Sequence, residues 1–160
     1  MNTPISTRWI GVEHTVQAAA YAAGDLIGGK ITIPAALSGT NPTAVIAGVK
    51  IDDKDGLAVN LNLVIFSADP TATTFTDNGA FTPADADLSK IATIVPITTH
   101  YAFANNGISS AENLAHAIRA EKVATTHYGT VGIFGALVAT AATTYTTTSA
   151  LKIWLKVMQD

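Results

Sequence analysis

The stretch AVIAGVKIDDKDGLAVNLNLVIF, residues 44–66, decides the fold. Apolar residues recur at every second position on both sides of a polar break that runs from Asp53 to Gly56. Period-two alternation is typical of a half-buried β-strand, and an Asp-Gly pair between two such runs is a strong hairpin signal. We therefore predict two strands that flank a turn at Asp53–Gly56 and pair with each other as a hairpin.

The rest of the chain carries further strand patterns. Residues 151–158 alternate in the same way, and residues 131–140 are apolar on both faces, as expected of a central strand covered on both sides. Weaker patterns predict strands in three more ranges, 9–16, 26–33 and 91–98. Pro96 cannot donate a ladder hydrogen bond, so the strand that contains it is predicted to lie at a sheet edge or to carry a bulge.

Two segments carry helix signals. Thr82-Pro83-Ala84-Asp85 is typical of a helix start, with Thr82 as N-cap and Pro83 at the first helical position, and predicts one short helix to about Lys90. Residues 109–112 form a capping box, but residues 113–119 also alternate as a strand would. Because an eighth strand would complete two packed sheets, we favour a strand over 113–119 and keep a helix as the alternative.

Many short strands and almost no helix indicate an all-β fold. We predict an antiparallel two-sheet β-sandwich, jelly-roll-like, with about eight strands and one short helix. The chain has 160 residues, which fits one sandwich domain over 1–160. A domain of that size can bury a substantial core without disulfides.

The composition is poor in charge. Only 13% of residues are charged and the formal net charge is −3, with no basic cluster, so nucleic-acid binding is not expected. Cys is absent, which excludes disulfides, thiolate zinc sites and Cys nucleophiles. Ala and Thr replace the missing charges, and a neutral surface of this kind suits contact with other protein. A Thr-rich β-domain with no special purpose is the alternative.

Metal and catalytic motifs are not evident. The four His residues, at positions 14, 100, 116 and 127, show no ligand spacing, and His14 lies on an apolar face, so we expect a hydrogen-bonded core or interface histidine there. Asp52–Gly56 resembles part of a calcium loop. With Gly56 at the sixth position, however, Ile51 and Asn62 occupy the first and twelfth positions, where ligands are required. We therefore predict no metal site.

Acidic and glycine-rich segments also lack the features of an active site. Asp77, Asp85 and Asp87 lie in a turn and at a helix start, where carboxylates usually cap backbone N–H groups rather than catalyse glycoside hydrolysis. Gly28-Gly29 begins no phosphate or dinucleotide loop and is predicted to mark a bulge. The expectation is that the chain is not an enzyme, with no catalytic residue and no cofactor.

The two tryptophans are the strongest candidates for contact with a partner. Trp154 has Lys152 and Lys156 on its face, and Trp9 follows Arg8. An aromatic ring among cations can stack on a sugar or anchor a protein partner. Alternatively, the second sheet covers Trp154 while the lysine stems run along its rim.

No targeting or membrane segment is expected. Residues 1–8 are polar, without the apolar core of a signal peptide. The longest apolar run, 131–142, is shorter than the about 20 residues that span a bilayer. We expect no membrane partner.

Three stretches together resemble a known family. They are AYAAGDLIGGKITI (20–33), DPTATTFTDNGAFTPADADLSKI (69–91) and YGTVGIFGALVATAATTYTTTSALKIWLKV (128–157). In combination they resemble a group of small structural proteins of tailed bacteriophages, found with the head genes and described as capsid decoration, cement or minor virion proteins. The segment 105–122 departs most from that pattern.

The resemblance implies a β-sandwich that binds and stabilises an assembled head. The implied partners are the major capsid protein and further copies of the chain, with a homotrimer expected because decoration proteins often cap threefold positions. The implied location is the capsid surface of the virion, after folding in the bacterial cytoplasm, where structural disulfides are rare. The alternative is a carbohydrate- or receptor-binding module of a tail or fibre.

Contacts with the capsid are expected from loops, because connections project from a sandwich while strand cores do not. The predicted contact elements are the loops 67–79 and 141–150 and the two termini. The predicted interface residues lie in these loops and on the tryptophan face: Trp9, Thr73, Thr74, Thr146, Thr147 and Trp154.

Overall fold

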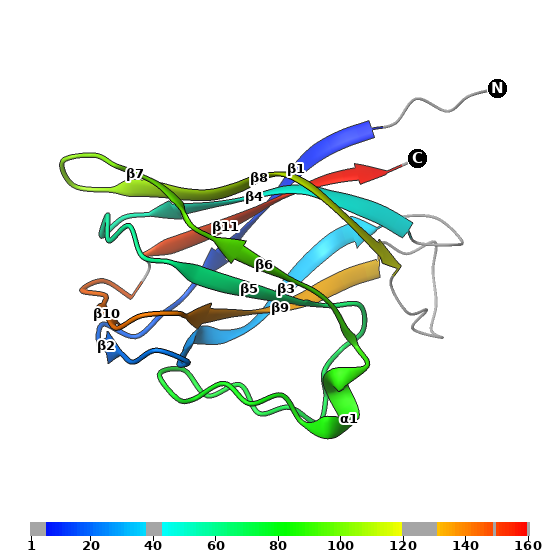
Figure 1. Ribbon diagram of the computed structural model, residues 1–160, viewed down its shortest axis with the longest axis horizontal. Helices are drawn as coiled ribbons and strands as arrows, with labels where there is room; N and C mark the ends of the chain where they lie inside the picture. Colours follow the sequence, from blue (N-terminus) through cyan, green and yellow to red (C-terminus); the bar gives the residue numbers. More distant parts are fainter. Residues whose placement is uncertain (1–5, 38–42, 120–130, 149, 160) are drawn as a thin grey trace.

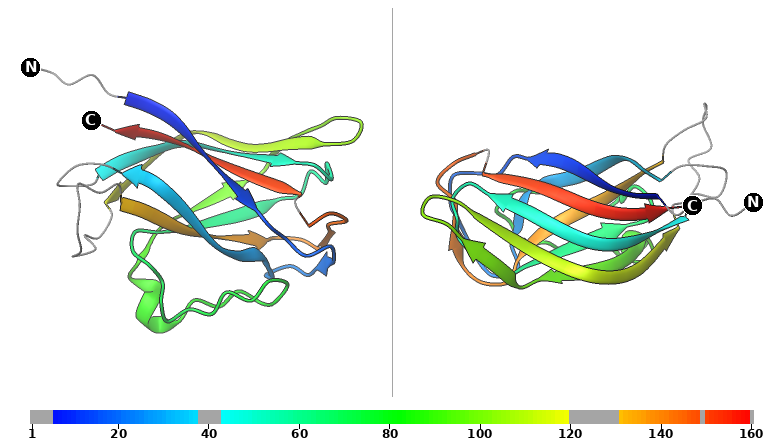
Figure 2. Two further views of the ribbon diagram at one scale, coloured as in Figure 1. Left: turned by 180° about the vertical axis from the view of Figure 1, so that it is seen from behind. Right: turned by 90° about the horizontal axis from the view of Figure 1, so that it is seen from above.

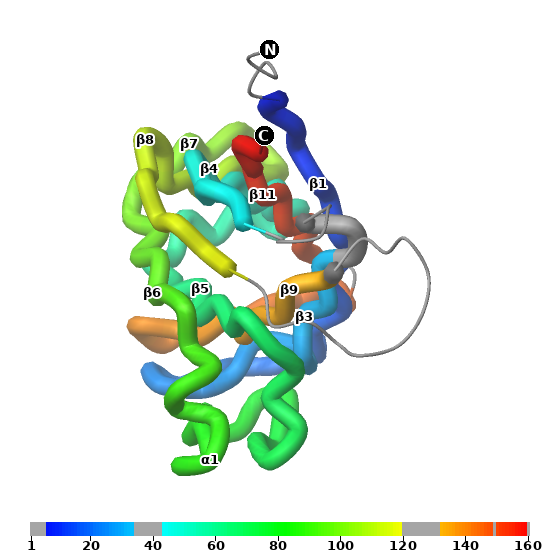
Figure 3. Tube along the Cα trace, turned by 90° about the vertical axis from the view of Figure 1, so that its right-hand side faces the viewer, coloured from blue at the N-terminus to red at the C-terminus, as the bar shows by residue number. Residues whose placement is uncertain are grey.

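The computed structural model describes residues 6–37, 43–119, 131–148 and 150–159, which form two antiparallel sheets packed face to face (Figure 1). The five-stranded sheet has the order β1-β11-β4-β8-β7, and the four-stranded sheet has the order β3-β9-β5-β6. A two-stranded ladder joins β10 to β2 at one end. Figure 3, which views the sandwich end-on, shows the two layers.

The strands of the five-stranded sheet are β1 (Ser6–His14), β11 (Leu151–Gln159), β4 (Thr43–Asp53), β8 (Gly107–Arg119) and β7 (Thr99–Ala102). Those of the four-stranded sheet are β3 (Leu26–Leu37), β9 (Val131–Ala139), β5 (Leu61–Phe66) and β6 (Ile91–Ile97). The small ladder consists of β2 (Ala20–Tyr21) and β10 (Thr143–Thr144), and the helix α1 spans Asp85–Leu88.

The strand order is that of a jelly roll. Among the eight long strands counted in chain order, the first, eighth, third and sixth lie side by side in one sheet, and the second, seventh, fourth and fifth lie in the other. This interleaving is the double Greek key that defines the jelly roll. The predicted all-β, antiparallel two-sheet sandwich is therefore confirmed.

The predicted hairpin over residues 44–66 is wrong. β4 pairs with β11 and β8, whereas β5 pairs with β6 and β9 in the opposite sheet. The connection crosses from one layer to the other, with Ala58 at a φ of 48°. The Asp53 carboxylate stabilises the bend by accepting hydrogen bonds from the N–H groups of Asp55 and Leu57, both at 2.9 Å.

The alternation of β4 and β5 specifies burial, and burial is what the structure shows. Ile46, Val49 and Ile51 of β4 face Leu63 and Ile65 of β5 across the space between the sheets, and all are buried. Two strands with inward apolar faces can pair edge to edge or pack face to face. In this chain they pack face to face, so the pattern predicted two half-buried strands but not their pairing. A bulge between Ile46 and Gly48 also moves the buried face of β4 from Ala44 and Ile46 to Val49 and Ile51.

The other strand predictions are confirmed. β9 lies between β3 and β5, and its outward residues pack in a second apolar cluster that also contains Phe66. β6 is an edge strand, as Pro96 required. Residues 113–119 are strand rather than helix, with Asn113 at a φ of 57° beside a register shift in the β4–β8 ladder.

The helix is shorter than predicted and begins later. Ala84 is the N-cap, not Thr82, and no side chain caps the first turn. Pro83 consequently precedes the helix instead of standing at its first position. The Asp87 side chain is turned inward and binds a neighbouring loop, which fixes the start of the helix by tertiary contact.

Candidate functional site

The outer face of the five-stranded sheet brings together the two predicted tryptophans. Trp9 lies opposite Lys156 in the β1–β11 ladder, and Trp154 lies opposite Gly11 in β1 and Lys50 in β4. Period-two geometry places these residues on one side of the sheet, because directly paired residues share a face. In Figure 2, right, this face is turned to the viewer, with β1 in blue and β11 in red.

The Trp154 indole lies flat on the sheet and is half-buried. A Cβ on Gly11 would stand 2.7 Å from the ring, so the glycine leaves the space that the indole fills. The indole Nε1 donates a hydrogen bond to Asp52 Oδ2 at 2.6 Å. Lys50 and Lys152 place their Nζ atoms 5.1 and 4.7 Å from the ring centroid, within cation–π distance.

The second predicted tryptophan is more accessible. Trp9 is 42% exposed, with Lys156 Nζ 5.6 Å from its ring centroid. Two of the three lysines of this face pair with acids, Lys152 with Glu13 at 2.9 Å and Lys50 with Asp52 at 3.0 Å. The face therefore offers aromatic surface together with lysines that are mostly paired with acids. These features suit contact with another protein better than the binding of an anion.

The predicted interface residue Thr73 is buried inside the subunit, which corrects that assignment. Its backbone N–H and its hydroxyl donate to Asp87 Oδ2 at 2.7 and 2.8 Å, and the hydroxyl accepts from the N–H of Ala84 at 3.1 Å. Lys90 lies 2.8 Å from the other carboxylate oxygen. Thr73 thus joins its loop to α1 and has no surface to offer a partner.

The loop that contains Thr73 also covers a sheet. Phe75 packs edge-on against Phe66 of β5 at 6.3 Å between ring centroids, and against Phe81 at 5.7 Å. These rings pack against the apolar cluster on the outward side of β5 and β9. In Figure 1 the segment between β5 and α1 runs below the sandwich. The predicted contact loop 67–79 is therefore also a structural cover, although Thr74 within it is exposed.

The loop around Thr146 and Thr147 is exposed and held by one carboxylate. Asp55 accepts hydrogen bonds from the N–H groups of Thr146 at 2.6 Å and Thr147 at 3.2 Å, and from the Thr147 hydroxyl at 2.9 Å. Desolvation of Asp55 opposes its ionisation, but these hydrogen bonds outweigh it and lower its pKa. The predicted contact residues at the termini, 1–5 and 160, lie outside the described residues.

Sequence reasoning missed the tip of the β7–β8 hairpin. Tyr101 is 63% exposed and Phe103 61%, the highest values among the large apolar side chains of the described ranges. The Phe103 N–H donates to the Asn106 carbonyl at 2.7 Å, which closes the turn. The signal was present in the sequence, because two aromatic residues flank Ala102 just before the turn residues Asn105-Asn106-Gly107.

One trio has the connectivity of a nucleophile, a base and an orienting group. His100 Nδ1 lies 2.8 Å from Ser109 Oγ, and His100 Nε2 lies 2.8 Å from Asn60 Oδ1. Ser109 is only 4% exposed, so a substrate carbonyl cannot approach its hydroxyl. These hydrogen bonds join β7 and β8 to the β4–β5 connection, and a structural role accounts for all of them.

The remaining titratable groups stabilise the interior. His14 is buried, as predicted, with Nε2 2.6 Å from the Ile27 carbonyl, and burial lowers its pKa. Asp77 Oδ1 accepts hydrogen bonds from the Tyr21 hydroxyl and the Gly28 N–H, both at 2.7 Å. In the part of the chain that the structure describes, no group of three or more His, Cys, Asp or Glu residues could hold a metal ion.

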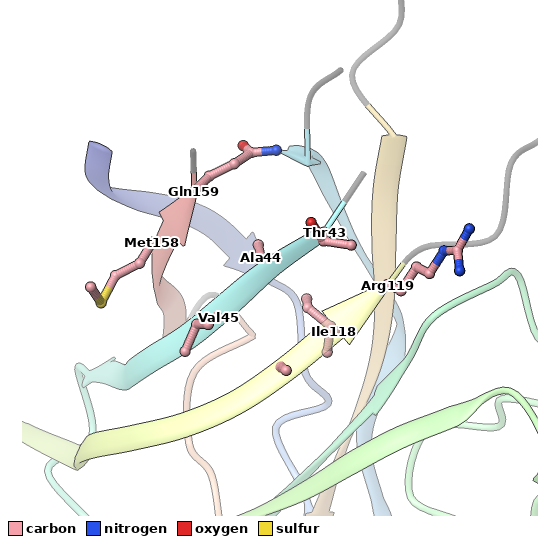
Figure 4. A pocket seen from close by; sticks show the side chains of 8 residues that line it. Thr43, Ala44, Val45, Ile118, Arg119, Met158 and Gln159 are labelled. Atoms are coloured by element: carbon pink, nitrogen blue, oxygen red, sulfur yellow. The ribbon is translucent and has the colours of Figure 1, made fainter. Parts of the chain in front are cut away.

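An open hollow of about 320 Å³ lies at the other end of the five-stranded sheet from the hairpin tip. Its walls are the ends of β4, β8 and β11, and apolar side chains such as Val45, Ile118 and Met158 contribute most of them (Figure 4). Arg119 extends away from the hollow at its rim.

Within the described ranges, no helix is long and apolar enough to cross a membrane.

Comparison with known proteins gives no family. No protein-family model matches the chain, and no curated protein matches it. Among solved structures, a chain described as "Sacbrood virus of honeybee - expansion state I" aligns with 13% identity and a TM-score of 0.29, covering 98% of this chain and 81% of that chain. A likeness at that TM-score carries no argument about function, which rests on the chain itself.

Proposed function

We propose that this chain is a virion structural protein, a capsid decoration or cement protein that binds the assembled head as an oligomer. The observation that carries the proposal is a jelly roll whose exposed aromatic side chains lie on the outer face and at the tip of one sheet. Jelly rolls are typical of viral capsid and lectin domains. The resemblance of residues 20–33, 69–91 and 128–157 to structural proteins of tailed bacteriophages favours the capsid.

The docking surface is the outer face of β1 and β11 together with the loop at Thr146 and Thr147. Trp9 supplies an exposed aromatic anchor, and aromatic residues dominate the energetics of protein interfaces. The two lysines beside Trp154, Lys50 and Lys152, are already paired with Asp52 and Glu13, so burying this face leaves few charges without partners. The partner is the major capsid protein, and neither nucleic acid nor a membrane is involved.

The work of such a protein is thermodynamic rather than catalytic. A ligand that binds the assembled shell but not the free subunits stabilises the shell at each site by RT ln(1 + L/Kd), where L is the free ligand concentration, so the effect grows as L rises above Kd. Oligomerisation, for which we propose a trimer on the strength of the resemblance, multiplies this effect because each further contact becomes intramolecular. We propose no catalytic residue and no cofactor, and we place the protein on the capsid surface after folding in the host cytoplasm.

Co-sedimentation with assembled shells of the major capsid protein tests this function. The chain should pellet with shells to a saturating stoichiometry and stay in the supernatant with unassembled capsid subunits. Trp9→Ser should weaken binding to shells by about 10-fold or more, as truncation of an interface aromatic does. Ile94→Ser is the matched control, since Ile94 is exposed to a similar degree, 51% against 42% for Trp9, on the opposite sheet.

The alternative, a carbohydrate- or receptor-binding module of a tail or fibre, is an outcome of the same experiment. The Trp154 ring has two lysine ammonium groups over it and its N–H is bound by Asp52, so sugar stacking would require these contacts to break. A wild-type chain that ignores shells but binds a glycan array through Trp9 would replace the capsid proposal with this one.

A further inference from the structure

Two features with complementary chemistry lie at opposite ends of β8. The β7–β8 hairpin tip, with Tyr101 and Phe103, lies beside the first residue of the strand, Gly107. The open hollow is lined by residues 117–119, at the strand's other end. β8 has 13 residues, and at ~3.3 Å per residue this separates the two features by about 40 Å. Figure 1 shows the tip at upper left and the strand ends at right.

The hairpin tip has the features of an anchor. Both aromatic side chains are more than half exposed, and the turn beneath them is closed by a backbone hydrogen bond from Phe103 to Asn106. No Asp, Glu, Lys or Arg occurs between Ile91 and Ala111, so the tip can enter an apolar site without burying a charge. A hairpin paired into a sheet loses little conformational freedom on binding.

The hollow has the features of a receptor for such an anchor. Its volume of about 320 Å³ far exceeds the space that one water molecule needs, and apolar side chains form most of its wall. Arg119 is exposed at the rim and its side chain extends away from the hollow, so its charge does not occupy the apolar space. The hollow therefore suits an uncharged aromatic side chain better than a charged one.

We propose that the hairpin tip of one copy of this chain inserts into the hollow of a second copy. The 40 Å separation along β8 prevents a copy from filling its own hollow, so the contact joins different surfaces of two molecules. Such a heterologous contact builds a ring when its rotation closes and a filament when it does not. A second copy is the chosen occupant because one strand carries both complementary halves.

The size of the tip supports a closed ring. Two side chains bury far less than the about 800 Å² per partner that a stable pairwise interface needs. In a ring every copy uses both its tip and its hollow, and the last contact to form is intramolecular, which raises the stability of the whole. The inference names the self-contact of the oligomer and in that respect rests on the proposed function.

Sedimentation of paired variants tests the contact. Phe103→Ser removes the anchor, and Ala117→Trp fills the hollow from an exposed position on β8. Each variant alone should be monomeric, with self-association at least about 30-fold weaker than in the wild type. Mixed together, the two variants should pair only weakly, as a 1:1 heterodimer at high concentration and nothing larger, because only one productive tip–hollow pair exists between them and no ring can close. Leu88→Ser, which alters an exposed apolar residue on α1, should keep the wild-type oligomer.

Two results overturn the inference: a wild-type chain that stays monomeric at high concentration, or folded Phe103→Ser and Ala117→Trp variants that keep the wild-type oligomer. Circular dichroism establishes that each variant is folded. Shell co-sedimentation separates this failure from failure of the proposed function. A monomer that still pellets with shells would support the capsid role and contradict this self-contact. An oligomer that does not bind shells would support the self-contact and contradict the capsid role.

Discussion

Gly28 and Gly29 are neighbours in β3, but only Gly28 has surroundings that require glycine. Its φ is 72°, and a Cβ there would collide with the His14 ring and stand 2.5 Å from the Thr15 carbonyl oxygen. Gly29 has nothing within 4 Å of an added Cβ. The bulge between Ile27 and Ile31, which the Gly-Gly pair predicted, therefore depends on the first glycine alone.

Gly28→Ala should lower the free energy of unfolding by about 2–4 kcal/mol, because a left-handed backbone and a collision with His14 add together. Gly29→Ala should change it by less than about 1 kcal/mol. Urea denaturation of both variants measures the difference. Equal effects at the two positions would contradict the close approach of β1 to β3.

Asp87 makes the free energy of unfolding depend on pH in the acidic range. Lys90 is the largest influence that lowers the pKa of Asp87 to about 2, with hydrogen bonds from Thr73 in support and burial acting in the opposite direction. Because the pKa is lower in the folded than in the unfolded state, the unfolded chain takes up the proton first as pH falls. The stabilisation is complete above about pH 4, the usual pKa of an Asp, and is lost as pH falls toward 2.

The comparison of wild type with Asp87→Asn isolates this contribution. The variant should have a lower urea midpoint at neutral pH, and the gap should shrink between pH 4 and pH 2. Asp85→Asn, at an exposed position of the same helix turn, should leave the midpoint nearly unchanged throughout. If the difference in urea midpoint between wild type and Asp87→Asn stays constant down to pH 2, Asp87 contributes through its packing and hydrogen bonds and not through its charge.

At the scale of elements, the loop 67–79 is a cover as much as a contact loop. Phe75→Ala should destabilise the fold by about 2–3 kcal/mol, somewhat below the cost of losing a fully buried Phe, because the ring is partly exposed. Thr74→Ala, at the exposed neighbouring position, should cost less than about 0.5 kcal/mol. Thermal unfolding measures both, and a neutral Phe75→Ala would mean that the loop rests on the sheet without supporting it.

The strands were predictable from the sequence because alternation reports burial, and burial is local. β5 and β11 each bury the face that their pattern indicated. In β4 the pattern indicated Val45, Ala47, Val49 and Ile51, but a bulge between Ile46 and Gly48 turns the strand, so that only Val49 and Ile51 of that face are buried. The partner of each strand was not predictable in this way. The Asp53–Gly56 break allows a hairpin turn and a crossover alike, and the choice depends on β8, β9 and β11, which lie far away in sequence.

The candidate site was predictable only in part for the same reason. Trp9 and Trp154 could be singled out as candidates because aromatic residues beside lysines stand out in any sequence, and the structure places both on one face of the five-stranded sheet. Thr73 was misjudged because its partner, Asp87, lies 14 residues away across a loop. The aromatic tip at Tyr101 and Phe103 was missed because exposure at a turn depends on the absence of a covering element, which no local pattern reports.

At the scale of the whole molecule, the loop threonines test the docking surface. Thr146 and Thr147 belong to the proposed docking surface and are exposed, and replacing both by Lys should weaken binding to capsid shells by about 100-fold or more, because burying unpaired ammonium groups costs on the order of several kcal/mol. Thr32→Lys, at an exposed position of β3, is the control and should bind normally. Equal binding by the double variant, measured by co-sedimentation, would place the docking surface elsewhere.

Quantitative mass spectrometry of intact virions, purified from the cells that produce this chain, tests the capsid role most directly. A decoration protein should be present in a fixed ratio to the major capsid protein, and the ratio should persist through density-gradient purification. Treatment that strips the outer surface without opening the head should remove it. Virions that lack the chain, while the same lysate contains it in soluble form, would contradict the account.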